Sequence, residues 1–226
     1  MSAQFAPGTP VVPRGGLVLL DPGTGMVLRV ITLQYNPDTV TRTLQPQGVG
    51  AEPGDRSEAL RLRGSAHETI RLEAELDATV QLEDPFAPGN DVVAEHGLLP
   101  VLATLDLLVN PTADALLAQD DAARNGAFEI APVESPLTVF VWGRDRVVPV
   151  RLTEFTVTEE AFDSNLNPIR AKVSLSLRIL TIDDLGFTHR GSGLFLGHQR
   201  RREQLAALHR SDPLSALGLT APPGGT

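Results

Sequence analysis

The chain has 226 residues, a length that suits one globular domain or one domain with an appendage. Hydrophobic residues make up 42% of it, which is enough to bury a core and argues against global disorder. The formal net charge of −9 disfavours sequence-independent binding of nucleic acid, and the absence of cysteine excludes disulfides, thiolate zinc sites and cysteine nucleophiles.

The N-terminal segment is rich in proline and glycine, so residues 1–16 are predicted to form a flexible arm. They lack the basic region followed by an apolar stretch that marks a secretory signal peptide. No run of the chain approaches the ~18 apolar residues that cross a bilayer. We therefore expect synthesis in the cytoplasm and no direct insertion into a membrane.

Two strands are predicted next, at residues 17–20 and 26–35, with a turn at 21–25 between them. Asn36-Pro37 ends the second strand, because proline lacks the amide hydrogen that a sheet needs. The connection is the first of two Asn-Pro corners that lie beside a predicted strand.

Residues 45–65 hold prolines and glycines among charged residues, so this segment is predicted to be a long loop that a partner orders. The strand predicted at 69–77 has the clearest alternation in the first half of the chain. Its expected inward-facing residues are Ile70, Leu72, Ala74 and Leu76. Its expected outward-facing residues are Arg71, Glu73, Glu75 and Asp77.

Leucines at helical spacing predict the main helix at 97–109, where Pro100 fits only in the first turn. Asn110-Pro111 ends it. Residues 113–123 are interpreted as either a second short helix or a loop.

The second half of the chain returns to strands, with an apolar run at 137–142 and a hairpin turn at 143–146. The strand predicted at 147–158 changes the phase of its apolar residues, which indicates a β-bulge near Thr153-Glu154. A compact connection is expected at 159–170, followed by a cleanly alternating strand at 172–180.

These elements predict a mainly β protein of the α+β class, with six or seven mostly antiparallel strands and one main helix. We expect the β domain to span 17–187. The extension 188–226 is expected to hold a basic helix around 196–209 and to end in a disordered tail.

No catalytic or metal-binding signature occurs, and we expect neither a catalytic residue nor a cofactor. Glu154, Glu159 and Glu160 could form the carboxylate pair of a glycoside hydrolase, but solvated charges at a strand end are commoner. The glycine-rich segment 188–193 lacks the strand–helix context of a phosphate-binding loop.

A basic run at Arg200, Arg201 and Arg202 is interpreted as a solvated helix face or as a contact for an acidic protein surface. Nucleic acid is a less favoured partner, because no aromatic residues are interleaved with the arginines and the whole chain is acidic.

Four stretches of the chain together resemble the tube-protein domain in baseplates of extracellular contractile injection systems, of the antifeeding prophage and Photorhabdus virulence cassette type. The stretches are VITLQYNPDTVTRTL at 30–44, ETIRLEAELDATVQLE at 68–83, PLTVFVWGRDRVVPV at 136–150 and LTEFTVTEEAFDSNLNPIRAKVSLSLRILTIDDL at 152–185. The last is the most specific, and the resemblance covers roughly residues 15–190.

This resemblance implies a phage-tail-tube-like antiparallel β-barrel or sandwich, packed side by side into a ring of six around a channel. It implies a structural role as tube initiator or adaptor, with the chain itself, inner-tube, spike-hub and baseplate wedge proteins as partners. Members usually carry a C-terminal LysM module, whereas the residues after 185 show no such pattern. Assembly in the cytoplasm into a phage-tail-like particle is expected, and release of that particle is left open.

Contact residues are expected where aromatic side chains stand beside the two Asn-Pro corners. The residues are Tyr35, Asn36, Pro37, Glu159, Phe162, Asn165, Asn167 and Pro168.

Two other functions stay open at the level of sequence. The chain could be an inner-tube subunit proper, or a β-rich module that binds cell wall or carbohydrate. The aromatic content of 4% argues against the second, since sugar-binding clefts usually need aromatic platforms.

Overall fold

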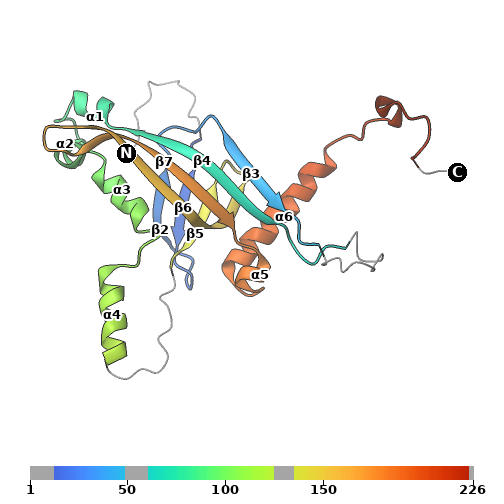
Figure 1. Cartoon of the computed structure of the whole chain (residues 1–226), viewed down its shortest axis with the longest axis horizontal. Helices are drawn as coiled ribbons and strands as arrows, with labels where there is room; N and C mark the ends of the chain where they lie inside the picture. Colours follow the sequence, from blue (N-terminus) through green and yellow to red (C-terminus); the bar gives the residue numbers. More distant parts are fainter. Residues whose placement is uncertain (1–12, 49–60, 125–134, 224–226) are drawn as a thin grey trace.

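The computed structural model describes residues 13–48, 61–124 and 135–223. Its centre is one antiparallel sheet of seven strands in the order β2-β1-β5-β6-β7-β4-β3 (Figure 1). The strands are β1 (Gly16–Leu20), β2 (Val27–Thr32), β3 (Val40–Gln45), β4 (His67–Asp77), β5 (Leu137–Val141), β6 (Val147–Phe162) and β7 (Pro168–Ile179). The mainly β, antiparallel α+β class predicted from the sequence is confirmed.

The expected tube-like barrel or sandwich is not confirmed, because within the described residues the sheet is not closed and β2 and β3 are its two edges. Every neighbouring pair is antiparallel, so these two edge strands run in the same direction. Closing the sheet on itself would pair them in parallel, and parallel neighbours need a crossover of about a dozen residues or more. Residues 33–39, which join β2 to β3, provide only seven.

The basic helix expected around 196–209 is present as the last of the α-helices, and three helices at 79–83, 91–96 and 182–185 were not predicted. The α-helices are α1 (Thr79–Glu83), α2 (Asp91–His96), α3 (Leu99–Asp106), α4 (Ala113–Arg124), α5 (Ile182–Leu185) and α6 (Arg190–Ala207), and a 3-10 helix, η1, follows at Leu214–Leu217. The helix predicted at 97–109 corresponds to α3, with Pro100 in its first turn as expected. The short helix at 113–123 is present as α4, which stands away from the sheet (Figure 1).

The core lies between the sheet and α3, which contributes Leu102 and Leu105 together with its N-cap residue Leu98. The predicted alternation along β4 is confirmed, since Ile70, Leu72, Ala74 and Leu76 are all buried. Phe195 of α6 belongs to the same buried cluster. The first part of the C-terminal extension therefore packs against the β domain.

The phase slip predicted near Thr153-Glu154 is a register shift between β6 and β7. Leu152 pairs with Leu177 and Glu154 pairs with Ser176, so one residue of β6 has no partner on β7. This bulge is the point where β6 changes neighbours, because only its first residues pair with β5. The bulge therefore joins the half-sheet β2-β1-β5 to the half-sheet β7-β4-β3.

The β6–β7 hairpin is longer than predicted, since β6 continues to Phe162 and β7 begins at Pro168. The compact connection expected at 159–170 is therefore a turn of only residues 163–167. The glycine-rich segment at 188–193 also differs from expectation, because it forms the first turn of α6. A Cβ on Gly191 would collide with Leu185 of α5, so glycine allows the two helices to approach closely.

Two expectations fall mostly outside the described residues. These are the flexible arm at 1–16, of which only residues 13–16 are described, and the loop at 45–65, of which residues 49–60 are not described. The described ends of that loop are joined, because Arg63 donates its backbone N–H to the carbonyl of Gln47.

Candidate subunit interface

The edge strand β2 exposes an apolar row. Val27, Leu28 and Val30 are each more than half exposed, while Ile31 on the opposite face is buried in the core. An exposed, apolar edge strand is a template for pairing with another chain unless it is covered or carries charges. Its only charged residue is Arg29, which donates to Thr104 of α3.

The second edge, β3, has the same length as β2, six residues, and is almost wholly exposed. It pairs with β4 on one side only, from Val40–Leu72 to Gln45–His67. Its side chains are mostly polar, apart from Val40 and the half-exposed Leu44. The two edges are therefore alike in length and direction and different in polarity.

The face of the sheet away from α3 is polar over β4, β7 and the second half of β6. Register places Arg71, Ser176 and Glu154 in one row across the strands, and Glu73, Ser174 and Thr156 in the next. A shallow groove of about 290 Å³ runs along these rows, and Thr41 of β3, Leu72 and Leu175 also line it. Arg71, Glu73, Glu154 and Ser174 contribute exposed polar side chains to the groove.

Carboxylates outnumber cations on this polar face. Lys172 lies 2.9 Å from Glu160, and this hydrogen bond and ion pair, with weaker attraction from Glu75 and Glu73, raise the pKa of Lys172. The four residues predicted to face outward from β4 do so, Arg71, Glu73 and Glu75 fully and Asp77 in part.

The carboxylates considered for glycoside hydrolysis are not arranged as a pair. Glu154 and Glu159 lie on one strand, five residues apart, so their Cα atoms are separated by about 16 Å at ~3.3 Å per residue. Catalytic pairs of that class stand about 5–9.5 Å apart. Glu160 is engaged by Lys172.

The first group of predicted contact residues lies in the β2–β3 connection. The Asn36 side chain accepts from the Gly15 N–H at 2.9 Å and donates to the Pro13 carbonyl at 3.0 Å. Asn36 therefore holds the start of β1 against the end of β2, as expected of a structural corner. Tyr35 is 50% exposed, so its ring is not a core residue, and Pro37 is half-buried.

The second group lies at the tip of the β6–β7 hairpin, at the end of the molecule that carries α1 and α2 (Figure 1). Glu159, Phe162 and Asn165 are exposed there. Asn167 donates to Asp163 and to the Glu95 carbonyl of α2, and Pro168 is fully buried. Asn167 and Pro168 thus shape the tip, while the other three residues are accessible to a partner.

The third group, on α6, is largely engaged within the chain. Arg201 pairs with Asp145 at 2.8 Å, Arg202 pairs with the buried Glu68, and Arg200 is exposed. Glu68 also accepts from Arg42 of β3 at 2.6 Å. The arginine run therefore fastens α6 to the sheet, and of its members Arg200 is the one open to an acidic partner.

Electrostatics agrees with this fastening role. Burial by itself would raise the pKa of Glu68, but hydrogen bonds from Arg42 and Arg202 outweigh it and hold the pKa below its usual value. Burial and the nearby Arg202 lower the pKa of His198, whose Nδ1 is buried without a hydrogen-bond partner. The Glu68–Arg42–Arg202 cluster is an ion network at the α6–sheet interface.

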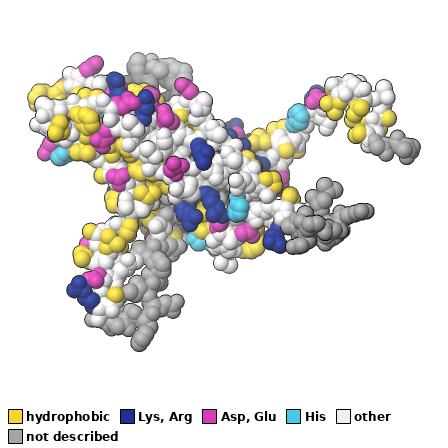
Figure 2. All heavy atoms as spheres, viewed as in Figure 1, with side chains coloured by type: hydrophobic (Ala, Val, Ile, Leu, Met, Phe, Trp, Pro, Cys, Tyr) yellow, Lys and Arg dark blue, Asp and Glu magenta, His cyan; other side chains and the backbone are white. Residues whose placement is uncertain are grey.

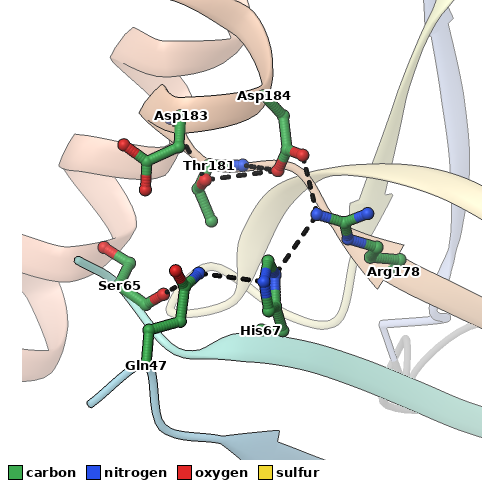
Figure 3. Close-up of polar contacts among 7 residues, drawn as sticks. All are labelled: Gln47, Ser65, His67, Arg178, Thr181, Asp183 and Asp184. Carbon is green, nitrogen blue, oxygen red and sulfur yellow. Dashed lines mark hydrogen bonds and ion pairs between the residues drawn. The ribbon is translucent and has the colours of Figure 1, made fainter. Parts of the chain in front are cut away.

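A second polar network joins β4, β7 and α5 (Figure 3). Arg178 donates to Nδ1 of His67 at 3.2 Å and to Asp184 at 2.7 Å, and Asp184 also accepts from the N–H of Thr181. The Gln47 side chain, after β3, contacts His67 and donates to the Ser65 carbonyl. The network ties the strand ends to the capping box of α5.

Sequence reasoning missed Glu68, His67 and Leu166 as notable residues. One signal was available for Glu68, which lies two residues before Ile70 and so occupies an inward-facing position of β4. Within the residues that the structure describes, no group of three or more histidine or acidic side chains is arranged to hold a metal ion.

Comparison with protein-family models and with curated proteins finds no match for this chain. In the part of the chain that the structure describes, none of the helices combines the length and apolar character needed to cross a membrane.

Proposed function

We propose that this protein is a structural baseplate subunit of a contractile injection system. In this role it forms or joins a ring of six that connects the spike hub to the inner tube. It acts by assembly and needs no cofactor. Neighbouring copies meet through the two sheet edges, and the polar sheet face lines the channel.

The observation that carries the proposal is the pair of open edges, β2 and β3. They have equal length and run in the same direction, so a rotation about one axis brings β3 of one copy beside β2 of the next. The contact is heterologous, since it uses two different surfaces, and repeated rotation closes it into a ring. Burying the apolar row of β2 would remove the exposed edge that a lone subunit presents.

The polar face supports the proposal that this side of the sheet lines the channel. A channel that passes cargo must not bind it, and the rows containing Arg71, Glu73 and Lys172 present charged and hydroxyl side chains. The resemblance of residues 15–190 to the tube-protein domain supplies the remaining support for the ring of six and its partners.

The proposal is tested by expressing the chain alone and together with the proteins encoded by neighbouring genes. The mass of the resulting particles is measured, and the particles are imaged by electron microscopy. We expect rings of six copies, or incorporation into tail-like particles. The edge variant Leu28→Glu/Val30→Lys places two charges on β2 without touching the core. It should abolish the ring and leave the monomer folded, because charged side chains on an edge strand oppose its pairing with another chain.

Leu217→Lys provides the matched control, since Leu217 is 75% exposed in η1, which stands away from the sheet (Figure 1). It should leave ring formation unchanged. A chain that stays monomeric with every partner and never enters a particle would refute the proposal. Incorporation along the whole tube in many copies would instead identify an inner-tube subunit.

A further inference from the structure

The β6–β7 hairpin tip presents one apolar side chain in a strained conformation. Leu166 has φ +66° and is the non-glycine residue with a positive φ in the described part of the chain. The left-handed conformation costs about 1–2 kcal/mol for a residue with a Cβ, so a glycine would be the ordinary choice here. Leu166 is also 80% exposed, so packing within the chain does not repay that cost.

The tip is built around the carboxylate of Asp163. It accepts from the backbone N–H groups of Asn165 and Asn167 at 2.7 and 2.8 Å and from the Asn167 side chain. Asn167 also reaches the Glu95 carbonyl, and Leu98 donates to the Pro168 carbonyl at 2.7 Å. These contacts hold the tip against α2 and α3, so Leu166 is presented from a fixed support.

The surroundings of Leu166 are acidic and apolar. Residues 79–96 contain four carboxylates and no lysine or arginine, and residues 158–168 contain three carboxylates and again no lysine or arginine. The exposed Phe162 and Phe86 lie at the same end of the molecule. Figure 2 shows hydrophobic and acidic side chains beside one another at the end that carries α1 and α2.

An apolar groove lies at the opposite end of α3 from this tip. Its volume is about 390 Å³, at the low end of the ~300–1,000 Å³ range of small-ligand pockets. Its lining includes Leu19, Leu107, Val109, Leu137 and Leu152. Arg151 and His189 are its basic side chains, and the neighbouring Arg190 guanidinium bonds the Thr24 carbonyl. The nearby Asp21 carboxylate is directed into its own turn, where it accepts from Thr24.

We propose that the Leu166 tip of one copy inserts into this groove of a second copy. The groove offers an apolar floor and the cation Arg151, which complement the apolar and acidic tip. A tip cannot occupy the groove of its own chain, because α3 separates the two and the tip is fixed to the start of α3. Neither surface includes β2 or β3, so this contact does not depend on the proposed ring.

The first test replaces the side chain and keeps the backbone. Leu166→Gly is compatible with φ +66°, so the hairpin should remain folded while the apolar contact is lost. We expect the full chain to self-associate in sedimentation velocity at low salt, and Leu166→Gly to weaken that association by about tenfold or more. Leu217→Gly, which removes another leucine 75% exposed, is the control and should not change it.

The second test blocks the groove. Leu107 and Val109 are about half exposed, so Leu107→Glu/Val109→Glu should not disturb the core, yet it sets carboxylates against the acidic tip. This variant alone should not self-associate through the tip. An equimolar mixture with Leu166→Gly should form a dimer and nothing longer, because each pair then has one intact tip and one intact groove.

Three results would overturn the inference. They are a wild-type chain that stays monomeric at every concentration, self-association that survives both variants, and a mixture that forms no dimer. The edge variant Leu28→Glu/Val30→Lys separates this contact from the proposed ring. It should leave the tip–groove association intact, so either proposal can fail while the other stands.

Discussion

The two ends of the long β6–β7 hairpin are stabilised in different ways. At the α5–α6 end, charged side chains from distant parts of the sequence meet inside the protein, as Glu68 does with Arg42 and Arg202. At the tip, one carboxylate, Asp163, organises five consecutive residues and leaves Leu166 in solvent. The first end is built to hold elements together, and the second to present a side chain.

The largest effect on stability is expected at the α5–α6 end of the hairpin. Glu68→Ala removes the shared acceptor of two arginines, and because Glu68 is only 3% exposed we expect a loss of about 3 kcal/mol in the free energy of unfolding. Glu160→Ala breaks the more exposed pair with Lys172 and should have little effect. Urea unfolding of both variants measures the difference, and equal losses would contradict the comparison.

Acidification should weaken the same end in two steps. The pKa of His198 in the folded protein lies below its usual value near 6.5, so the folded form resists protonation and stability falls as the pH drops below that value. The pKa of Glu68 is also depressed, so its contribution is full above about 4.5 and is lost as the pH falls through the lower folded value.

The two steps are measured as melting temperature against pH for the wild type and two variants. His198→Gln should flatten the curve only in the pH range just below 6.5, and Glu68→Gln only in the pH range below about 4.5. The groups that face His198 are Arg202, Glu68 and Arg42, together with the backbone of Asp145. A curve that keeps its upper slope in His198→Gln would show that another group is responsible.

The smallest effect on stability is expected at the hairpin tip, where Leu166 is exposed. Leu166→Gly relieves the left-handed strain but gives the unfolded chain more freedom. The free energy of unfolding should therefore be unchanged or rise by at most about 1 kcal/mol, as measured by urea unfolding. A clear loss of stability would mean that Leu166 is a structural residue, which its exposure argues against.

Sequence patterns predicted the parts of the fold that have one buried and one exposed face. The alternation in β4 and the bulge near Glu154 follow from burial against a single core. The place of Pro100 in the first turn of α3 follows from its missing N–H. The strand β3 was missed because an edge strand with few buried side chains has no such alternation.

The candidate surfaces were less predictable. Tyr35 and Phe162 were expected at contacts and are half exposed, but Arg201 and Arg202 find acidic partners that are 56 and 134 residues away in sequence. Only the topology brings such residues together. The left-handed Leu166 also could not be predicted, because leucine has no preference for that backbone.

The shared direction of β2 and β3 has a consequence for any particle in which copies join at these edges. Because the sheet has seven alternating strands, its two edge strands run in the same direction, and neighbouring copies must join in the same orientation. A closed circle of such copies has two chemically distinct rims, one bearing every acidic hairpin tip. A partner that binds one rim would not bind the other. Further layers would therefore be added to such a circle in one direction only, beginning with the first layer.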